Sequence, residues 1–155
     1  MNRIPLSSQA GALKSYFPDS KVTFSNEISL SWTHTVTPTP VSDSYTLKLT
    51  YKKGSGVDVF VVDPKRLKLA KGKKRLPHVY SHKKQELCLY YPSAEVRERK
   101  WYPDMFLVHT VVPWAVEWLE FYEYWLGKGD WHGGGIHPTS KKEEHEFEKS
   151  TKSKH

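Results

Sequence analysis

The sequence is poor in residues that build disulfides and metal clusters, and it has no long apolar run. Its 155 residues include a single cysteine, Cys88. One cysteine excludes an internal disulfide and a zinc site made of several thiolates. No stretch approaches the roughly 18 uninterrupted apolar residues of a membrane span, and the first residues lack the charged and apolar regions of a signal peptide. We therefore expect a soluble, cytoplasmic protein without a membrane segment, in which the role of Cys88 is the main question.

Acidic residues are absent from residues 65–84, which contain nine Lys or Arg. The whole chain has 24 basic and 17 acidic residues, so the remainder carries 15 − 17 = −2. The basic surplus is therefore local, which predicts either a docking patch or a mobile basic loop. This segment could bind nucleic acid through phosphate neutralisation and stacking on Tyr80. Because no nucleic-acid motif accompanies it, we do not expect a specific nucleic-acid function.

The residues that are present indicate one folded domain of the α+β class. Apolar spacings of three and four over residues 6–17 predict a short amphipathic helix, with serines near its start and proline after it. Strict alternation predicts antiparallel strands in residues 28–36, 45–52 and 57–62, and residues 22–24 can add a fourth in front. We expect an N-terminal helix followed by a four-stranded antiparallel meander. The domain is assigned to residues 1–138, and residues 139–155 are expected to form a polar, disordered tail.

A second helix is predicted from Pro113, packed on the sheet and ending before Gly127. Its aromatic side chains lie on one stripe, which is typical of core packing and not of a ligand-stacking site. The following residues, 129–138, contain three consecutive glycines and therefore predict a loop. Trp131 in this loop is expected to pack down, and His132 and His137 receive no assigned role.

Cys88 lies between two leucines in a short apolar run that predicts extended chain. From its context alone, a buried packing residue is one interpretation. A reactive thiol is the other, because His78, His82 and the basic segment could lower its pKa. A third residue to orient an imidazole is missing, which argues against a cysteine protease. Neither HExxH nor CxxC spacing occurs, so we expect no metal site and no cofactor.

The segments around Cys88 resemble the ubiquitin-conjugating enzymes. That family has a His-Pro-Asn motif, often followed by Val-Tyr, about ten residues before a catalytic cysteine flanked by aliphatic residues. Here residues 76–80 read Leu-Pro-His-Val-Tyr and residues 87–89 read Leu-Cys-Leu. The departures are Leu76 in place of the histidine and His78 in place of the asparagine.

A closer resemblance is to the divergent ubiquitin-conjugating-like proteins of bacterial type II CBASS antiphage operons. The matching features are Leu-Cys-Leu-Tyr at 87–90, the Pro-Trp helix with its Trp-Leu-x-Phe-Tyr-Glu run at 113–123, and Gly-x-Trp-x-Gly-Gly-Gly at 129–135. Together they extend the resemblance over residues 6–138. It implies a ubiquitin-conjugating-like fold and a catalytic cysteine at Cys88.

The resemblance also implies a reaction. Cys88 would accept the activated C-terminal glycine of a cGAS-like nucleotidyltransferase as a thioester and pass it to an amine on a target protein. His78 is the candidate donor to the tetrahedral oxygen, a contribution of about 3 kcal/mol in other enzymes. Tyr80 and Trp131 would brace the active-site loop. No Gly-rich nucleotide loop leads into a helix, so activation would require a separate enzyme.

Two other functions remain open from the sequence. The first is a non-catalytic adaptor of the same fold that binds the nucleotidyltransferase through the basic segment. The second is a nucleic-acid-binding module, for which binding must weaken steeply with salt.

Overall fold

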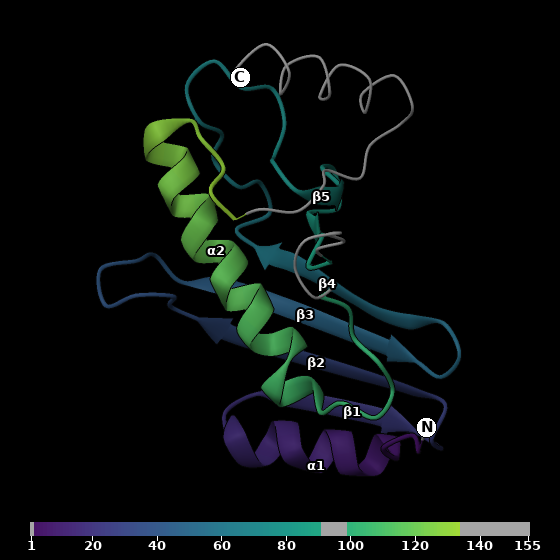
Figure 1. The fold of residues 1–155 in the computed structure, drawn as a ribbon. Helices are drawn as coiled ribbons and strands as arrows, with labels where there is room; N and C mark the ends of the chain where they lie inside the picture. The colour runs from purple at the N-terminus through teal and green to yellow at the C-terminus, as the bar shows by residue number, and fades with distance from the viewer. Residues whose placement is uncertain (1, 91–98, 134–155) are drawn as a thin grey trace.

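The computed structural model describes residues 2–90 and 99–133, which form an antiparallel sheet covered on one face by a long helix (Figure 1). The strand order is β1-β2-β3-β4-β6-β5. The first helix, α1, comprises Leu6–Tyr16 and lies beside the edge strand β1, whereas α2, Val111–Lys128, crosses the sheet face. The α+β class with a C-terminal helix on the sheet is therefore confirmed.

The first four strands form the meander that the alternation predicts. They are β1, Lys21–Ser25, β2, Ser29–Val36, β3, Tyr45–Lys52, and β4, Gly56–Asp63. Their apolar positions meet in register, because Trp32 pairs with Leu49 and Leu49 pairs with Val59. All three side chains are buried in the core. The two-residue period of the sequence thus translates directly into one apolar sheet face.

The prediction of a four-stranded sheet was wrong, because the sheet has six strands. The additional strands are β5, Val79–Ser81, and β6, Glu86–Leu87. Segments of three and two residues are too short to show an alternating pattern. They form because β6 pairs with β4, where Phe60 lies opposite Glu86 and Val61 N donates to Gln85 O at 3.0 Å.

Helix α2 contributes more buried side chains to the core than helix α1 does. It begins at Val111, two residues before the predicted start, and continues through Gly127 to Lys128. Gly129 has φ +80° and caps the helix by donating to Trp125 O at 2.6 Å, a conformation that glycine adopts without strain. The aromatic stripe packs as core: Trp118, Tyr122 and Trp125 are buried.

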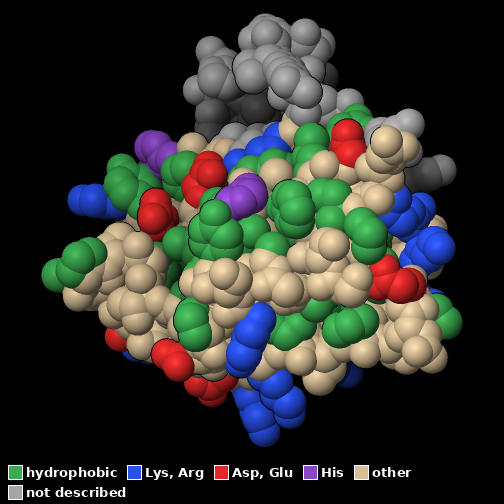
Figure 2. Space-filling model, turned by 90° about the horizontal axis from the view of Figure 1, so that it is seen from below, with side chains coloured by type: hydrophobic (Ala, Val, Ile, Leu, Met, Phe, Trp, Pro, Cys, Tyr) green, Lys and Arg blue, Asp and Glu red, His purple; other side chains and the backbone are tan. Residues whose placement is uncertain are grey.

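Helix α1 is capped differently from the sequence-based expectation. Pro5 holds the N-cap position and makes no side-chain capping hydrogen bond, and the Glu27 carboxylate accepts one from Ser7 N in the first turn at 2.7 Å. Figure 2 shows this lower end of the molecule, where hydrophobic side chains are mixed with polar ones and the Lys and Arg side chains are scattered. Among the exposed aromatics, Tyr16 and Phe106 both contact His109, with ring centroids 5.0 and 6.1 Å away.

Within residues 2–90 and 99–133, neither helix combines the length and apolar character needed to cross a bilayer. The proposed domain boundary at residue 138 and the polar tail at 139–155 lie outside the described residues. Both stay predictions.

Candidate active site

The basic segment, residues 65–84, is anchored to the core and not loosely attached. Leu67, Ala70 and Leu76 are buried. The buried side chain of Gln85 accepts a hydrogen bond from Leu67 N at 2.6 Å and donates to Val61 O at 2.9 Å. Eight of the nine cationic side chains in the segment are exposed. Of the two expectations, a fixed basic patch describes the segment better than a mobile loop.

The β5–β6 hairpin fixes the backbone of Cys88. Val79 pairs with Leu87, and one step further along Cys88 N donates to His78 O at 3.1 Å. The same carbonyl accepts a hydrogen bond from Trp118 Nε1 on α2 at 3.0 Å. The position of the cysteine is therefore tied both to the hairpin and to the long helix.

The Cys88 side chain is buried, and the residue is 2% exposed. Its Sγ lies 3.7 Å from Tyr90 O. Burial raises the pKa of the thiol, while a backbone hydrogen bond from Tyr90, the Tyr80 hydroxyl and the charge of Arg99 act in the opposite direction without reversing it. The resting side chain is therefore a neutral thiol. Burial outweighs the nearby positive charge, so the net effect of the surroundings is to raise the pKa of this thiol.

His78 lies directly opposite Cys88 and is fully buried. Its φ of +50° places the backbone in the left-handed region, which is uncommon for a residue other than glycine. The imidazole packs on Trp131 with ring centroids 5.3 Å apart, and Trp131 also contacts Trp118 at 5.6 Å. As the sequence suggested, Trp131 braces this loop.

Gly133 is needed for that packing. A Cβ atom there would lie 2.8 Å from Trp131 Nε1 and 2.9 Å from Phe121 Cδ2. The glycine therefore lets the chain fold closely over the two rings. The other two glycines of the run and His137 lie outside the described residues, while His132 contacts the ring of Tyr124 at 4.5 Å.

Arg99 joins the segment after the cysteine to α2. Its Nε donates to Leu89 O at 3.1 Å, and its Nη1 forms an ion pair with Glu117 at 3.1 Å. Its guanidinium also lies over the ring of Trp114, 4.8 Å from the centroid. The charge of this arginine acts to lower the pKa of the Cys88 thiol.

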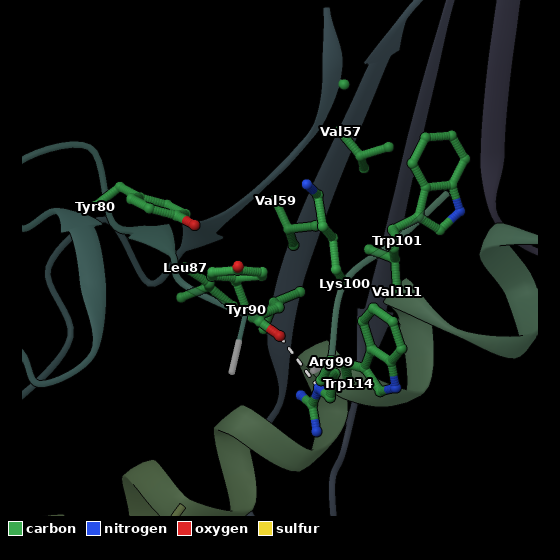
Figure 3. A pocket seen from close by; sticks show the side chains of 12 residues that line it. Val57, Val59, Tyr80, Leu87, Tyr90, Arg99, Lys100, Trp101, Val111 and Trp114 are labelled. Atoms are coloured by element: carbon green, nitrogen blue, oxygen red, sulfur yellow. Dashed lines mark hydrogen bonds between the residues drawn. The ribbon is translucent and has the colours of Figure 1, made fainter. Parts of the chain in front are cut away.

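A cavity of about 400 Å³ lies between the β4–β6 part of the sheet and the start of α2 (Figure 3). Leu87 and Leu89, the two neighbours of Cys88, contribute to its wall. Tyr80 and Tyr90 lie on one side of the cavity, and Trp101 and Trp114 lie on the other. The remaining lining residues are Gly56, Val57, Val59, Arg99, Lys100 and Val111. A mostly apolar cavity with a cationic rim suits an extended peptide segment.

Residues 9–138 match the family model described as type II CBASS E2 protein. The chain belongs to this family. A comparison with curated proteins finds no match. Membership gives the protein a role in CBASS and indicates a conjugating-type activity with a partner from the same system.

In this CBASS E2 protein, sequence reasoning located Cys88 and His78 but missed three neighbouring groups. Arg99 contacts Leu89 and α2 from a segment that no local pattern connects with Cys88. Asp58 and Glu86 come from different strands, and the charge of Asp58 adds to burial in raising the pKa of Glu86. Each depends on strand pairing or on contacts between distant segments, for which a single sequence gives no signal.

Among the described residues of this CBASS E2 protein, no three His, Cys, Asp or Glu side chains gather closely enough to hold a metal ion. His82 instead accepts a hydrogen bond at Nδ1 from Leu76 N at 3.0 Å. This histidine therefore helps to shape the turn before Cys88.

Proposed function

We propose that this protein is a ubiquitin-conjugating-like acyl transferase of bacterial type II CBASS. Cys88 accepts the C-terminal glycine of a cGAS-like nucleotidyltransferase as a thioester and transfers it to an amine of a target protein, which primes antiphage signalling in the cytoplasm. A separate activating enzyme supplies the acyl group. The observation that carries the proposal is the placement of Cys88, held opposite His78 and between two leucines that line a cavity of about 400 Å³.

The order and arrangement of the helices and strands support this assignment. A ubiquitin-conjugating-like domain needs an N-terminal helix, an antiparallel meander and a helix crossing the sheet behind the cysteine, and all three features occur here (Figure 1). The cysteine follows the last paired strand of the hairpin, where extended backbone leaves the flanking side chains directed into the cavity wall.

The surroundings of Cys88 suit a thioester better than a free thiolate. A thioester is neutral, so burial imposes no charge penalty on it, whereas burial raises the pKa of the free thiol. The thiol must lose its proton when it attacks the activated glycine. The hydroxyl of Tyr80 and the charge of Arg99 favour the thiolate at that moment.

His78 has two proposed contributions. Its backbone carbonyl holds Cys88 N at 3.1 Å, and its imidazole is the candidate hydrogen-bond donor to the tetrahedral oxygen. We expect His78→Asn, which retains a side-chain donor, to keep much more transfer activity than His78→Leu. Unfolding midpoints of both variants separate the two contributions, because a purely structural residue would lose stability and activity in parallel.

The experiment that tests the function is transfer of the donor to Cys88 in a purified system. Wild type incubated with the activating enzyme, ATP and the nucleotidyltransferase should give a reductant-labile adduct of the summed mass. Cys88→Ala should give none, and Cys88→Ser should give an ester that survives reductant. Circular dichroism of each variant controls for folding. An adduct that persists in Cys88→Ala would refute the assignment of Cys88.

A non-catalytic adaptor is the second candidate, and the fixed basic patch favours it. The exposed lysines could hold an acidic surface of the nucleotidyltransferase without any chemistry at Cys88. The double variant Lys73→Glu with Lys74→Glu would then abolish complex formation, while Cys88→Ala would bind and function normally. The matched control is Lys52→Glu with Lys53→Glu, since both lysines are exposed outside the patch.

A further inference from the structure

The chain that follows Cys88 folds back over its sulfur. Cys88 Sγ lies 3.7 Å from Tyr90 O, so the carbonyl two residues further along faces the thiol group. The cysteine is 2% exposed. A thiol as buried as this one cannot reach the carbonyl carbon of a macromolecular donor, because the reacting atoms must come into direct contact. The chain beside the thiol must therefore move before Cys88 can be loaded.

Arg99 holds this returning chain in place. Its Nε donates at 3.1 Å to Leu89 O, the backbone carbonyl between Cys88 and Tyr90. The arginine side chain is 16% exposed, and its donor is charged. A hydrogen bond with a charged donor is stronger than one between neutral groups. The fixed carbonyl of Leu89 thus restricts how far the adjoining backbone can move away from the sulfur.

Arg99 is itself attached to helix α2 at two points. Its Nη1 forms the ion pair with Glu117 at 3.1 Å, and its guanidinium lies 4.8 Å from the ring centroid of Trp114. Figure 3 shows Arg99 and Trp114 next to each other. Positions 114 and 117 are three residues apart, so they are neighbours on one side of the helix. The contacts run from α2 through one arginine to the carbonyl next to the cysteine.

These contacts border the cavity of about 400 Å³. Leu89, Tyr90, Arg99 and Trp114 all belong to its lining (Figure 3). A peptide segment that enters the cavity therefore touches both the arginine and the residue whose carbonyl the arginine holds. Such a segment is in a position to compete for the guanidinium and to release the chain over Cys88.

We propose that Arg99 is a positioning residue that keeps the chain closed over Cys88, and that the thiol becomes accessible to a macromolecular donor when the hydrogen bond between Arg99 and Leu89 opens. The use of this step in acyl transfer rests on the proposed function. Access to the thiol is a property of this chain alone and can be measured without any partner.

The two effects of Arg99 on Cys88 have opposite signs. Loss of its charge would raise the pKa of the thiol and slow the reaction with an alkylating reagent. Loss of its hydrogen bond would speed that reaction, because a buried thiol reacts only in the fraction of molecules that are locally open. Arg99→Lys keeps the charge but lacks the planar fork that serves Leu89 O and Glu117 together. This substitution therefore isolates the effect on access.

The test measures alkylation of the single cysteine by iodoacetamide in purified wild type, Arg99→Lys and Glu117→Gln, followed by intact mass. Titration of the ultraviolet absorbance of the thiolate gives the thiol pKa of each protein separately. Each rate is also measured at low concentrations of urea, and complete urea unfolding gives the global stability. Glu120→Gln is the matched control, because Glu120 is another carboxylate on α2 and is exposed.

At a pH below the thiol pKa, we expect Arg99→Lys to be alkylated about tenfold faster than wild type, in the range of a hydrogen bond with a charged donor. Glu117→Gln should react about threefold faster, because a partly exposed ion pair contributes less. Glu120→Gln should match wild type. The titrated pKa should be similar in wild type and Arg99→Lys, and low urea should leave the faster rate unchanged, because the opening is local.

Equal alkylation of Arg99→Lys and wild type would overturn the inference, and slower alkylation would show that only the charge matters. A faster rate that increases steeply with urea would also overturn it, since the thiol would then react through global unfolding. Loading is measured on the same proteins with a short synthetic peptide thioester that ends in glycine. Faster alkylation of Arg99→Lys together with no loading of either protein would refute the proposed function and leave the closed resting site in place.

Discussion

Replacing Tyr80 with phenylalanine removes one hydroxyl from the surroundings of Cys88 and retains the ring. The Tyr80 hydroxyl hydrogen bonds with the thiol group, and this bond lowers the thiol pKa because it favours the charged form. Burial already raises that pKa. The variant should therefore move the pKa further upward and never downward.

The size of the shift follows from the exposure of the two groups. A hydrogen bond to a charged partner contributes about 1.5–3 kcal/mol when it is buried. Cys88 is 2% exposed but Tyr80 is 49% exposed, so water replaces part of the lost bond. We take the lower end, which corresponds to about a tenfold loss of thiolate at a fixed pH below the pKa.

The assay is the rate of alkylation by iodoacetamide as a function of pH. Below the thiol pKa, Tyr80→Phe should react about tenfold more slowly than wild type, and its profile should lie at higher pH. Tyr124→Phe, which changes an exposed tyrosine on α2, is the control and should leave the profile unchanged. A superimposable profile for Tyr80→Phe would refute the hydrogen bond, and a profile at lower pH would refute the sign of the argument.

Three further predictions concern the support of the site, each measured by urea unfolding. Gly133→Ala should lower the free energy of unfolding by about 1–3 kcal/mol, because the added Cβ would press on Trp131. Gly11→Ala, on the open face of α1, is the control and should raise it by about 0.5–1 kcal/mol. Equal effects of the two substitutions would contradict the close packing at Gly133. Gln85→Ala should lower the free energy of unfolding by at least about 2 kcal/mol, because it leaves Leu67 N and Val61 O without their side-chain partner. An unchanged stability would contradict the importance of these hydrogen bonds. Trp118→Phe removes the hydrogen bond from Trp118 Nε1 to His78 O, so it should lower the free energy of unfolding by about 1–3 kcal/mol and slow the loading of Cys88. Unchanged loading would show that this hydrogen bond does not position the cysteine.

Much of the fold could be predicted because its longer elements carry strong periodic patterns. Alternation over five to eight residues defines β1 to β4, and the aromatic stripe defines α2. The β5–β6 hairpin could not be predicted, because Glu86–Leu87 becomes a strand only through its pairing with β4. The sequence also did not decide whether the basic segment is a fixed patch or a mobile loop. Its anchoring depends on a hydrogen bond to Gln85, which follows the segment in the chain.

The sequence motif connects Cys88 with His78, and the catalytic role of both residues stays a prediction. The motif around residues 76–80 and 87–89 located Cys88 and His78, which the structure places opposite each other. The sequence left the direction of the thiol pKa open, because burial is a property of the folded core and cannot be judged from neighbouring charges in the sequence. Arg99 escaped notice for the same reason, since it reaches Leu89 and Glu117 only after folding.

The most direct test of the account is the intact mass of the protein co-expressed with the nucleotidyltransferase and activating enzyme of its operon. Wild type and Cys88→Ala are compared, each with and without thiol reductant. The account predicts an adduct in wild type that reductant removes and that Cys88→Ala never forms. Identical species in both proteins, with no adduct even when ATP is supplied, would contradict thioester chemistry at Cys88 and leave the adaptor in its place.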